Sequence, residues 1–271
     1  MGNYQERNSG LVDGKTIIVT GCSSGIGAEV TDCLKSEGAK VVGIDLNPSS
    51  AVDHFIQANL ADGTSIESAI GAIPGDCNGL CNIAGLPPTR PAPQVLKVNF
   101  IGLRALTAGI VGKLADGASI TNLASLAGLG WQENIVQVKA LLALRSLEQA
   151  DAFCDQYDIQ AEPGRSYFLS KEALIVWTMQ SRWAWRDRGI RMNSVSPGPV
   201  ETPILPDFVE TLGDRVEEDF RVMDRPGTPQ DVAPLVAFLQ SDGSNWMRGL
   251  NIPCDGGMSS HVSLDAFGLA A

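Results

Sequence analysis

The chain has 271 residues, of which 44% are hydrophobic and 29 are glycine, and its formal net charge is −11 at pH 7. This length accommodates one α/β domain with a full-sized core. The acidic balance and the lack of basic runs argue against nucleic acid and anionic membrane surfaces as partners. No apolar run is judged long enough to cross a bilayer, and residues 1–6 show no secretory signal pattern, so we expect a cytoplasmic protein.

Cysteine and histidine usage gives little support for a metal centre. The six cysteines are scattered with no Cys-x-x-Cys pair, and the only histidines are His54 and His261. Cysteines spaced in this way in a cytosolic chain are expected to be reduced and packed as small apolar residues. We therefore predict no metal site and no histidine-based mechanism.

A buried strand followed by a glycine-rich turn opens the fold. Residues 16–19 are β-branched, the glycines Gly21, Gly25 and Gly27 follow, and a helix is predicted over 28–36. Glycines let a backbone approach a pyrophosphate, and a helix N-terminus offers free N–H groups and a positive dipole end. A tight turn without a ligand is the alternative, but this order of elements favours dinucleotide binding.

The second predicted strand, over 40–44, ends at Asp45. A carboxylate at this place accepts hydrogen bonds from both hydroxyls of an adenosine ribose and repels a 2′-phosphate. Neither position 22 nor the neighbours of Asp45 supply a cation for that phosphate. The pattern predicts NAD rather than NADP, against the alternative of a solvated carboxylate at a strand end.

The middle of the chain continues the alternation of strands and helices. Only eight residues, 46–53, precede the third strand, which is too few for a crossover helix. Asn99 falls inside a helix, where it either supports a local kink or holds a water molecule. Ser125 follows a strand, at the rim where α/β sheets bind ligands. The expected elements are strand 54–58, helix 64–73, strand 79–83, helix 93–114 and strand 118–123.

The segment 165–188 is predicted as a largely apolar helix that carries Tyr167 and Lys171. Residues four apart share a helix face, so the phenol and the ammonium group point into one pocket. The positive charge is expected to lower the tyrosine pKa from about 10 and to make Tyr167 a proton donor and acceptor. A solvated pair on an exposed helix is the alternative.

The last third of the chain completes one doubly wound parallel sheet in a single domain, residues 1–271. We expect strand 191–195, helix 229–240 with Thr228 as N-cap and Pro229 at its first position, and strand 250–253. The tail 258–271 either reaches a neighbouring subunit or frays. Segment 203–224 is expected to close over a substrate with the apolar side chains of Ile204, Leu205, Phe208, Val209, Leu212, Val222 and Met223.

Taken together, these motifs resemble the short-chain dehydrogenase/reductase family, in the family's order from about residue 15 to residue 257. They are Thr20-Gly21-x-x-x-Gly25-x-Gly27, Asn82-x-Ala84-Gly85, Asn99, Ser125, Tyr167-x-x-x-Lys171, Pro197-Gly198-Pro199-Val200-x-Thr202 and Asp255-Gly256-Gly257. The resemblance implies a Rossmann-type α/β fold. It also implies an oxidoreductase that interconverts an alcohol and a carbonyl by hydride transfer with NAD(H).

The resemblance assigns a role to each matching residue. Tyr167 is the acid/base, and Lys171 lowers its pKa and binds the nicotinamide ribose. Ser125 orients the reacting oxygen, and Asn99 holds a water molecule that links the lysine to solvent. Contacts with the cofactor are expected from Gly21, Ser23, Ser24, Gly25, Ile26, Gly27, Asp45, Leu46, Asn59, Leu60, Asn82, Ala84, Gly85, Tyr167, Lys171, Pro197, Gly198, Val200 and Thr202.

Three departures from the family pattern stand out. Asn59 occupies a position usually held by aspartate, and Ile83 replaces a second asparagine. A long stretch, about 126–164, is inserted before Tyr167, and its apolar positions over 135–157 predict an amphipathic helix. The insertion either pads the body of the protein or forms a wall or lid over the substrate pocket. Its place between two catalytic residues favours the lid.

The short second crossover and this insertion resemble the bacterial 3α-hydroxysteroid dehydrogenase/carbonyl reductase subgroup, which includes coniferyl-alcohol dehydrogenases. The stretches 172–177 and 191–200 look close to the coniferyl-alcohol branch. The subgroup implies a bulky apolar or aromatic alcohol, coniferyl-alcohol-like or 3α-hydroxysteroid-like, with another ketone or cyclic alcohol as the alternative. A non-catalytic dinucleotide-binding protein is disfavoured because Tyr167 and Lys171 are both present. We expect a homodimer or homotetramer, although the insertion could obstruct a helix contact common in the family.

Overall fold

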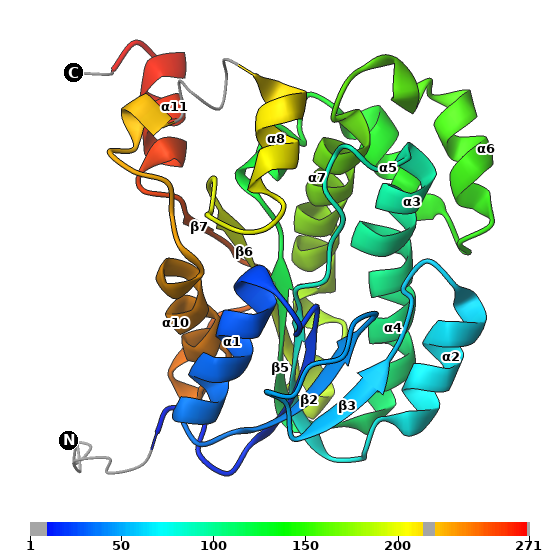
Figure 1. Cartoon of the computed structure of the whole chain (residues 1–271), viewed down its shortest axis with the longest axis vertical. Helices are drawn as coiled ribbons and strands as arrows, with labels where there is room; N and C mark the ends of the chain where they lie inside the picture. The colour runs from blue at the N-terminus through cyan, green and yellow to red at the C-terminus, as the bar shows by residue number, and fades with distance from the viewer. Residues whose placement is uncertain (1–9, 214–219, 270–271) are drawn as a thin grey trace.

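The computed structural model describes residues 10–213 and 220–269 (Figure 1). The start of the chain at 1–9, residues 214–219 of segment 203–224 and the last two residues of the tail lie outside the described residues. Within them, seven parallel strands form one sheet in the order β3-β2-β1-β4-β5-β6-β7. The strands are β1 Thr16–Thr20, β2 Lys40–Asp45, β3 His54–Gln57, β4 Cys77–Asn82, β5 Leu114–Leu123, β6 Arg191–Pro197 and β7 Asn251–Cys254.

The strand order confirms the doubly wound sheet. After β3 at one edge, the chain returns past β1 to β4, so the order reverses between β1 and β4. Ligands of open α/β sheets bind at the carboxyl ends of the strands beside such a reversal. The segment between β2 and β3 contains no helix, which confirms the short crossover expected from the sequence.

Helices cover both faces of the sheet (Figure 1). One buried cluster lies under α1 and α10 and includes Val30 and Val236, and the other, under α2, α4 and α7, includes Leu106 and Leu174. Because both faces are covered, the central strands are apolar on both sides. The helices that flank the sheet are α1 Gly25–Ser36, α2 Gly63–Ala72, α3 Ala92–Leu96, α4 Leu103–Ile110, α7 Arg165–Gln180 and α10 Pro229–Gln240.

The helix predicted over 93–114 is a continuous helical run, Ala92–Lys113, with a π-helical stretch at Lys97–Gly102 in its middle. By length and composition this run could span a membrane, so the judgement that no apolar run is long enough was wrong for this segment. In the fold this run packs against the sheet, and 56% of its most apolar stretch of 18 residues is buried. A Cβ atom on Gly102 would lie 1.9 Å from the carbonyl oxygen of Leu60, so glycine permits this close approach.

The insertion forms two helices, α5 Ile135–Ala143 and α6 Gln149–Gln156, rather than the single helix predicted over 135–157. The helix ends because the Arg104 guanidinium donates to the carbonyl oxygens of Leu142, at 2.8 Å, and Leu144, and the backbone then becomes extended at Leu144. A cation that caps the last carbonyl groups of a helix stabilises its end. Val138 and Phe153 join the buried cluster that lies under α7.

Other predicted boundaries shift by part of an element. Helix α7 ends at Gln180 rather than at residue 188, and two 3₁₀ turns follow it. At the start of α10, the Asp231 carboxylate accepts the backbone N–H of Thr228 at 2.7 Å, which confirms Thr228 as the cap and Pro229 as the first helical residue. Two further helices are α8 Leu205–Leu212, within the apolar segment, and α11 Met258–Ala266, in the tail.

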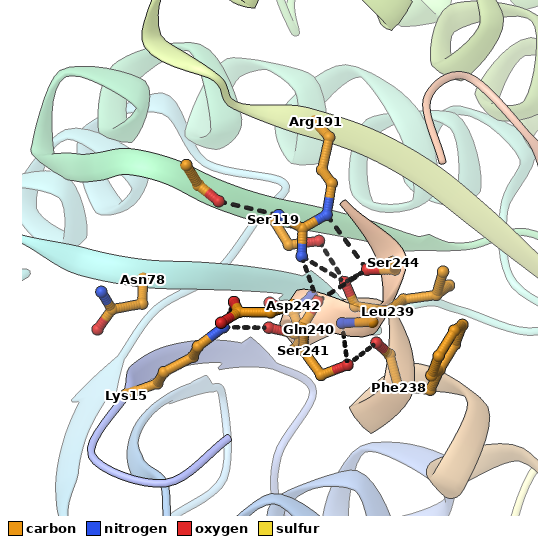
Figure 2. Close-up of polar contacts among 12 residues, drawn as sticks. Lys15, Asn78, Ser119, Arg191, Phe238, Leu239, Gln240, Ser241, Asp242 and Ser244 are labelled. Carbon is orange, nitrogen blue, oxygen red and sulfur yellow. Dashed lines mark hydrogen bonds and ion pairs between the residues drawn. The ribbon is translucent and has the colours of Figure 1, made fainter. Parts of the chain in front are cut away.

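Arg191, the first residue of β6, is buried among polar groups that include Ser119, Ser241 and Ser244 (Figure 2). It therefore lies at the end of β6 opposite the strand's carboxyl end. The Arg191 guanidinium is 2% exposed, and it donates to the carbonyl oxygens of Gly117 at 2.9 Å and Ser241 at 2.7 Å. Lys15 donates to the carbonyl oxygen of Gln240 at 3.0 Å in the same region. The two cations satisfy carbonyl groups at and beyond the C-terminus of α10; Arg191 anchors that helix to β5 and β6, and Lys15 anchors it to the start of β1.

Candidate active site

The glycine turn between β1 and α1 is closed by contacts that only glycine allows. Gly21 has a φ of +73°, and a Cβ atom on it would lie 2.8 Å from the backbone nitrogen of Ala84. A Cβ atom on Gly27 would lie 1.9 Å from the carbonyl oxygen of Gly21. Ser24, the N-cap of α1, makes no side-chain cap, so the first-turn N–H groups of the helix remain available to an anion. The turn therefore fits the pyrophosphate of a dinucleotide.

Asp45 ends β2 beside this turn. Its carboxylate accepts the backbone N–H groups of Ser23 and Asn47, both at 3.0 Å. These bonds hold the carboxylate between the glycine turn and the loop after β2, where Leu46 is exposed. A carboxylate fixed in this way retains acceptor capacity for ribose hydroxyl groups.

Of the residues expected on the adenosine side, Asn59 and Leu60 lie after β3, and Asn82 is the last residue of β4. Asn59 accepts the backbone N–H of Ala61 at 2.9 Å, and Leu60 is buried. The side chain of Asn82 does not line the crevice as expected, because its amide donates to Thr107 at 3.0 Å and Asn122 at 2.9 Å inside the protein. Asn82 therefore joins β4 to β5 and α4.

Ala84 and Gly85 follow β4 at the rim of the sheet. The backbone N–H of Ala84 donates to the hydroxyl of Thr20 at 3.1 Å, which ties this loop to the end of β1. A Cβ atom on Gly85 would lie 3.5 Å from the Asn99 Oδ1 atom and 3.9 Å from the Lys171 Nζ atom. The loop thus connects the glycine turn with the side chains of Asn99 and Lys171.

Tyr167, Lys171, Ser125 and Asn99 meet near the carboxyl ends of β4 and β5. The Lys171 Nζ atom lies 5.5 Å from the centroid of the Tyr167 ring and donates to the carbonyl oxygen of Leu123 at 2.7 Å. The Ser125 side chain lies beside the Tyr167 hydroxyl and acts to lower its pKa. Asn99 lies within the π-helical stretch, where its amide accepts the Leu86 N–H at 2.7 Å and donates to the Leu86 carbonyl at 3.0 Å. A π-turn in a long helix is a common feature of functional sites.

Burial controls the proton affinities of the central pair. It raises the pKa of Tyr167 to about 12, although the neighbouring Ser125 side chain opposes the shift. It also lowers the pKa of Lys171 to about 8. The expectation that Lys171 lowers the tyrosine pKa below its usual value is therefore wrong for the protein alone. Both shifts favour the uncharged forms because the two groups are shielded from water.

Lys171→Met is expected to raise the free energy of unfolding at neutral pH. Because burial lowers the pKa of Lys171 from 10.5 to about 8, the protonated amine is held at a cost on the order of 3 kcal/mol below pH 8. Methionine has a similar unbranched shape and no charge. Between about pH 8 and pH 10 the unfolded chain binds a proton that the folded site has lost, so the free energy of unfolding of the parent protein rises with pH. The difference in the free energy of unfolding between Lys171→Met and the parent therefore narrows over this range. Thermal unfolding at about pH 7 and about pH 9.5 measures both effects; a variant less stable than its parent at neutral pH would contradict the argument.

The loop after β6 carries the last expected contacts. Pro197 ends the strand, and the Gly198 N–H donates to the carbonyl oxygen of Cys254 at 3.3 Å. Val200 is buried and pairs with Gly227 in an isolated parallel bridge. Thr202 lies beside the glycine turn, since a Cβ atom on Gly25 would be 3.4 Å from its side chain. This loop therefore lies beside the glycine turn.

Helix α5 of the insertion and the residue before it contact the rear of α7. Arg165 and Glu172, seven residues apart, share a face of α7 that lies roughly 130° from the face of Tyr167 and Lys171. The insertion binds this rear face, because Arg165 donates to Gln137 at 2.8 Å and Asn134 donates to Glu172 at 2.8 Å. Val138 of α5 and Phe153 of α6 also join the core, so these two helices are packing elements, whereas a wall or lid formed by the rest of the insertion stays a prediction.

Comparison with known proteins gives matches along nearly the whole chain. Residues 15–137 match the family model described as short chain dehydrogenase, and residues 157–259 match the model described as Enoyl-(Acyl carrier protein) reductase. The coniferyl-alcohol dehydrogenase of Pseudomonas sp. (strain HR199 / DSM 7063) is 41% identical over 249 residues, covering 91% of this chain and 97% of that protein. This chain belongs to the short-chain dehydrogenase/reductase family.

Two further relatives of this short-chain dehydrogenase/reductase are steroid enzymes. The 3-alpha-hydroxysteroid dehydrogenase/carbonyl reductase of Comamonas testosteroni is 29% identical, covering 90% of this chain and 96% of that protein. The crystal structure of the 3-alpha-hydroxysteroid dehydrogenase from Pseudomonas sp. B-0831 complexed with NADH is 28% identical, with a TM-score of 0.78, and covers 91% of this chain and 97% of that chain. The resemblance predicted from the motifs is confirmed, and the protein is an oxidoreductase that interconverts alcohols and carbonyl compounds with a nicotinamide dinucleotide.

Of two further residues of the site, one was not predicted from the sequence and the other was predicted only in part. Gly128 packs on α7, where a Cβ atom would lie 2.7 Å from the carbonyl oxygen of Lys171, so it sets the distance between Ser125 and the helix. Phe208, expected only as one of several pocket residues, contacts the Tyr167 ring edge-on, with ring centroids 4.8 Å apart. A glycine three residues after Ser125 was the only sequence signal for Gly128, and none distinguished Phe208.

Proposed function

We propose that this enzyme oxidises a bulky aromatic primary alcohol to the aldehyde, and reduces the aldehyde in reverse, with NAD(H). The observation that carries the proposal is the buried pair of Tyr167 and Lys171, with the half-buried Ser125 next to the tyrosine. Hydride transfer is the chemistry of the bound nicotinamide. Tyr167 exchanges a proton with the substrate oxygen, and Ser125 orients that oxygen by donating a hydrogen bond.

Lys171 and Asn99 support Tyr167 from the side away from the substrate. With a pKa of about 8, the lysine is largely protonated at neutral pH, and its charge stabilises the phenolate that forms during reduction. Asn99 is fixed by Leu86, and a water molecule between its amide and Lys171 would carry the proton to solvent. Gly21, Ser24, Asp45 and Thr202 border the crevice in which the dinucleotide is proposed to lie.

The substrate class is supported by the apolar side chains of α8, whose Phe208 contacts the Tyr167 ring, and by the relatives. An open cavity of about 600 Å³ is lined mostly by apolar groups, from Glu201, Thr202, Pro203, Leu205, Pro206 and Val209. The 41% identical relative is a coniferyl-alcohol dehydrogenase, and two more distant relatives act on 3α-hydroxysteroids. The second candidate is therefore a 3α-hydroxysteroid or another cyclic alcohol.

A panel of alcohols tests this function. The purified enzyme is incubated with NAD and coniferyl alcohol, a 3α-hydroxysteroid or a small cyclic alcohol, and NADH formation is followed by absorbance. The proposal expects the highest kcat/KM with coniferyl alcohol. A higher kcat/KM with the steroid would transfer the assignment to the second candidate, and no NADH with any alcohol would overturn both.

The enzyme is expected to have a higher kcat/KM with NAD than with NADP, and Asp45→Ala is expected to narrow the difference in kcat/KM between the two cofactors. The substitution removes the charge that repels a 2′-phosphate and the acceptor for the ribose, so kcat/KM with NAD falls roughly 10- to 100-fold. Asp45→Asn keeps an acceptor for the Ser23 N–H, and the exposed Asp187→Ala is a control for charge alone. Equal kcat/KM for both cofactors in the unmodified enzyme would contradict the assignment.

We also propose a cytoplasmic homodimer or homotetramer. All six cysteines are free thiols, which agrees with a reducing compartment. Several large apolar side chains are exposed near the C-terminal end, among them Trp246 at 97% and Phe267 at 80%, and a partner subunit would cover them.

A further inference from the structure

One aromatic side chain packs against the proposed proton donor. The rings of Phe208 and Tyr167 meet edge to face, with an interplanar angle of 80° and centroids 4.8 Å apart. Tyr167 is 8% exposed, and Phe208 is one of the side chains that cover its ring. Edge-to-face aromatic pairs contribute about 0.5–1.5 kcal/mol beyond the area they bury.

Helix α8 is held in this position by one hydrogen bond to the loop after β4 and by a close approach to the start of α7. None of its residues is buried, so it has no apolar core of its own. The Thr89 hydroxyl, on the loop after β4, donates to the Asp207 carboxylate. Thr211, also on α8, lies close to Gly164 before α7, since a Cβ atom on Gly164 would be 3.1 Å from the Thr211 side chain. This contact places α8 against the start of α7. The loop after β4 and the N-terminus of α7 therefore fix the helix over Tyr167.

The side chains of α8 face in two directions, one toward the open apolar cavity and one toward Tyr167. Leu205 and Val209, four residues apart, line the open apolar cavity. Phe208 is not among the lining residues and turns to Tyr167 instead. The ring of Phe208 is thus the apolar surface on the catalytic side of the helix.

We propose that Phe208 selects aromatic substrates, because its ring forms the surface beside Tyr167 against which the ring of the substrate packs, and that Thr89 positions it through Asp207. This inference rests on the proposed function, since it concerns the substrate of the same site. A flat ring conjugated to the reacting carbon can lie against Phe208 while the alcohol oxygen reaches Tyr167. A saturated ring of the same size is thicker and lacks the aromatic contact.

A matched pair of substrates isolates this contact. Cinnamyl alcohol and 3-cyclohexylprop-2-en-1-ol have the same chain and the same allylic alcohol and differ only in the ring. We expect the parent enzyme to prefer the aromatic member roughly 2- to 10-fold in kcat/KM, as one aromatic contact allows. Phe208→Leu, which keeps an apolar side chain, is expected to bring the ratio close to one, and Phe208→Tyr to retain it. Thr89→Val, which removes the hydroxyl donor, is expected to lower the ratio in the same direction.

Binding without turnover separates this proposal from the function itself. The two alcohols are titrated into the NADH complex of each variant by calorimetry, and the ratio of their Kd values is compared. If the parent oxidises neither alcohol, the proposed function fails, but the Kd ratio still tests Phe208. A ratio in Phe208→Leu equal to that of the parent would overturn the role of Phe208. An unchanged ratio in Thr89→Val would overturn the positioning role of Thr89.

Discussion

Tyr167→Phe is expected to lower kcat/KM for alcohol oxidation by about 10²- to 10⁴-fold while NAD(H) affinity stays unchanged. The substitution removes one hydroxyl that no other group in the site replaces, because Ser125 donates a hydrogen bond but has no neighbouring base. The Tyr167 ring remains, and with it the edge-to-face contact with Phe208. Steady-state kinetics measures the loss, and NADH fluorescence titration measures the binding of the cofactor.

Tyr157→Phe is the matched control. Tyr157 lies at the end of α6 and packs on Phe153, with ring centroids 4.9 Å apart, so it belongs to the insertion behind α7. Removing its hydroxyl is expected to leave turnover unchanged. Near-normal turnover in Tyr167→Phe would show that another group exchanges the proton, and equal losses in both variants would point to a general effect on the fold.

The sheet could be predicted because its strands carry their own signal. Strands β1, β2 and β5 contain β-branched residues, and a residue type that marks the rim lies at or just after their ends, namely Gly21, Asp45 and Ser125. The spacing of Tyr167 and Lys171 likewise places both on one face of a helix without further knowledge. These features depend on residues near one another in the chain.

The errors concern contacts between distant parts of the chain. The insertion breaks into two helices because Arg104, 38 residues before Leu142, captures the carbonyl groups at the end of α5. The pKa of Tyr167 rises because its surroundings, including Phe208 from α8, exclude water. No local pattern shows which arginine or which aromatic ring will arrive at a site. The position of the insertion behind α7 depends on the same kind of contact, made by Arg165.

Arg165→Met is expected to lower the free energy of unfolding by about 3–5 kcal/mol. Arg165 and Glu172 form a bidentate pair at 3.0 Å and 2.8 Å, with the side chains 7% and 2% exposed. Removing the arginine leaves the Glu172 carboxylate buried with the Asn134 amide as a neutral donor, and an uncompensated buried charge is costly. For a chain of this size the loss corresponds to a Tm lower by roughly 10 °C. Thermal unfolding followed by the fluorescence of the five tryptophans measures it.

Two further variants show whether the buried charge, rather than lost packing, causes the effect. Lys97→Met breaks the ion pair with Asp151, which also links the insertion to the body but is 22% and 64% exposed, and it is expected to cost less than about 1 kcal/mol. Arg165→Met combined with Glu172→Met removes both charges and is expected to recover most of the lost stability, because an apolar pair of similar volume often replaces a buried ion pair without penalty. If the double variant is as unstable as Arg165→Met alone, the shape of the two side chains rather than the unpaired carboxylate holds the insertion against α7. If Lys97→Met is equally destabilising, burial does not distinguish the two contacts.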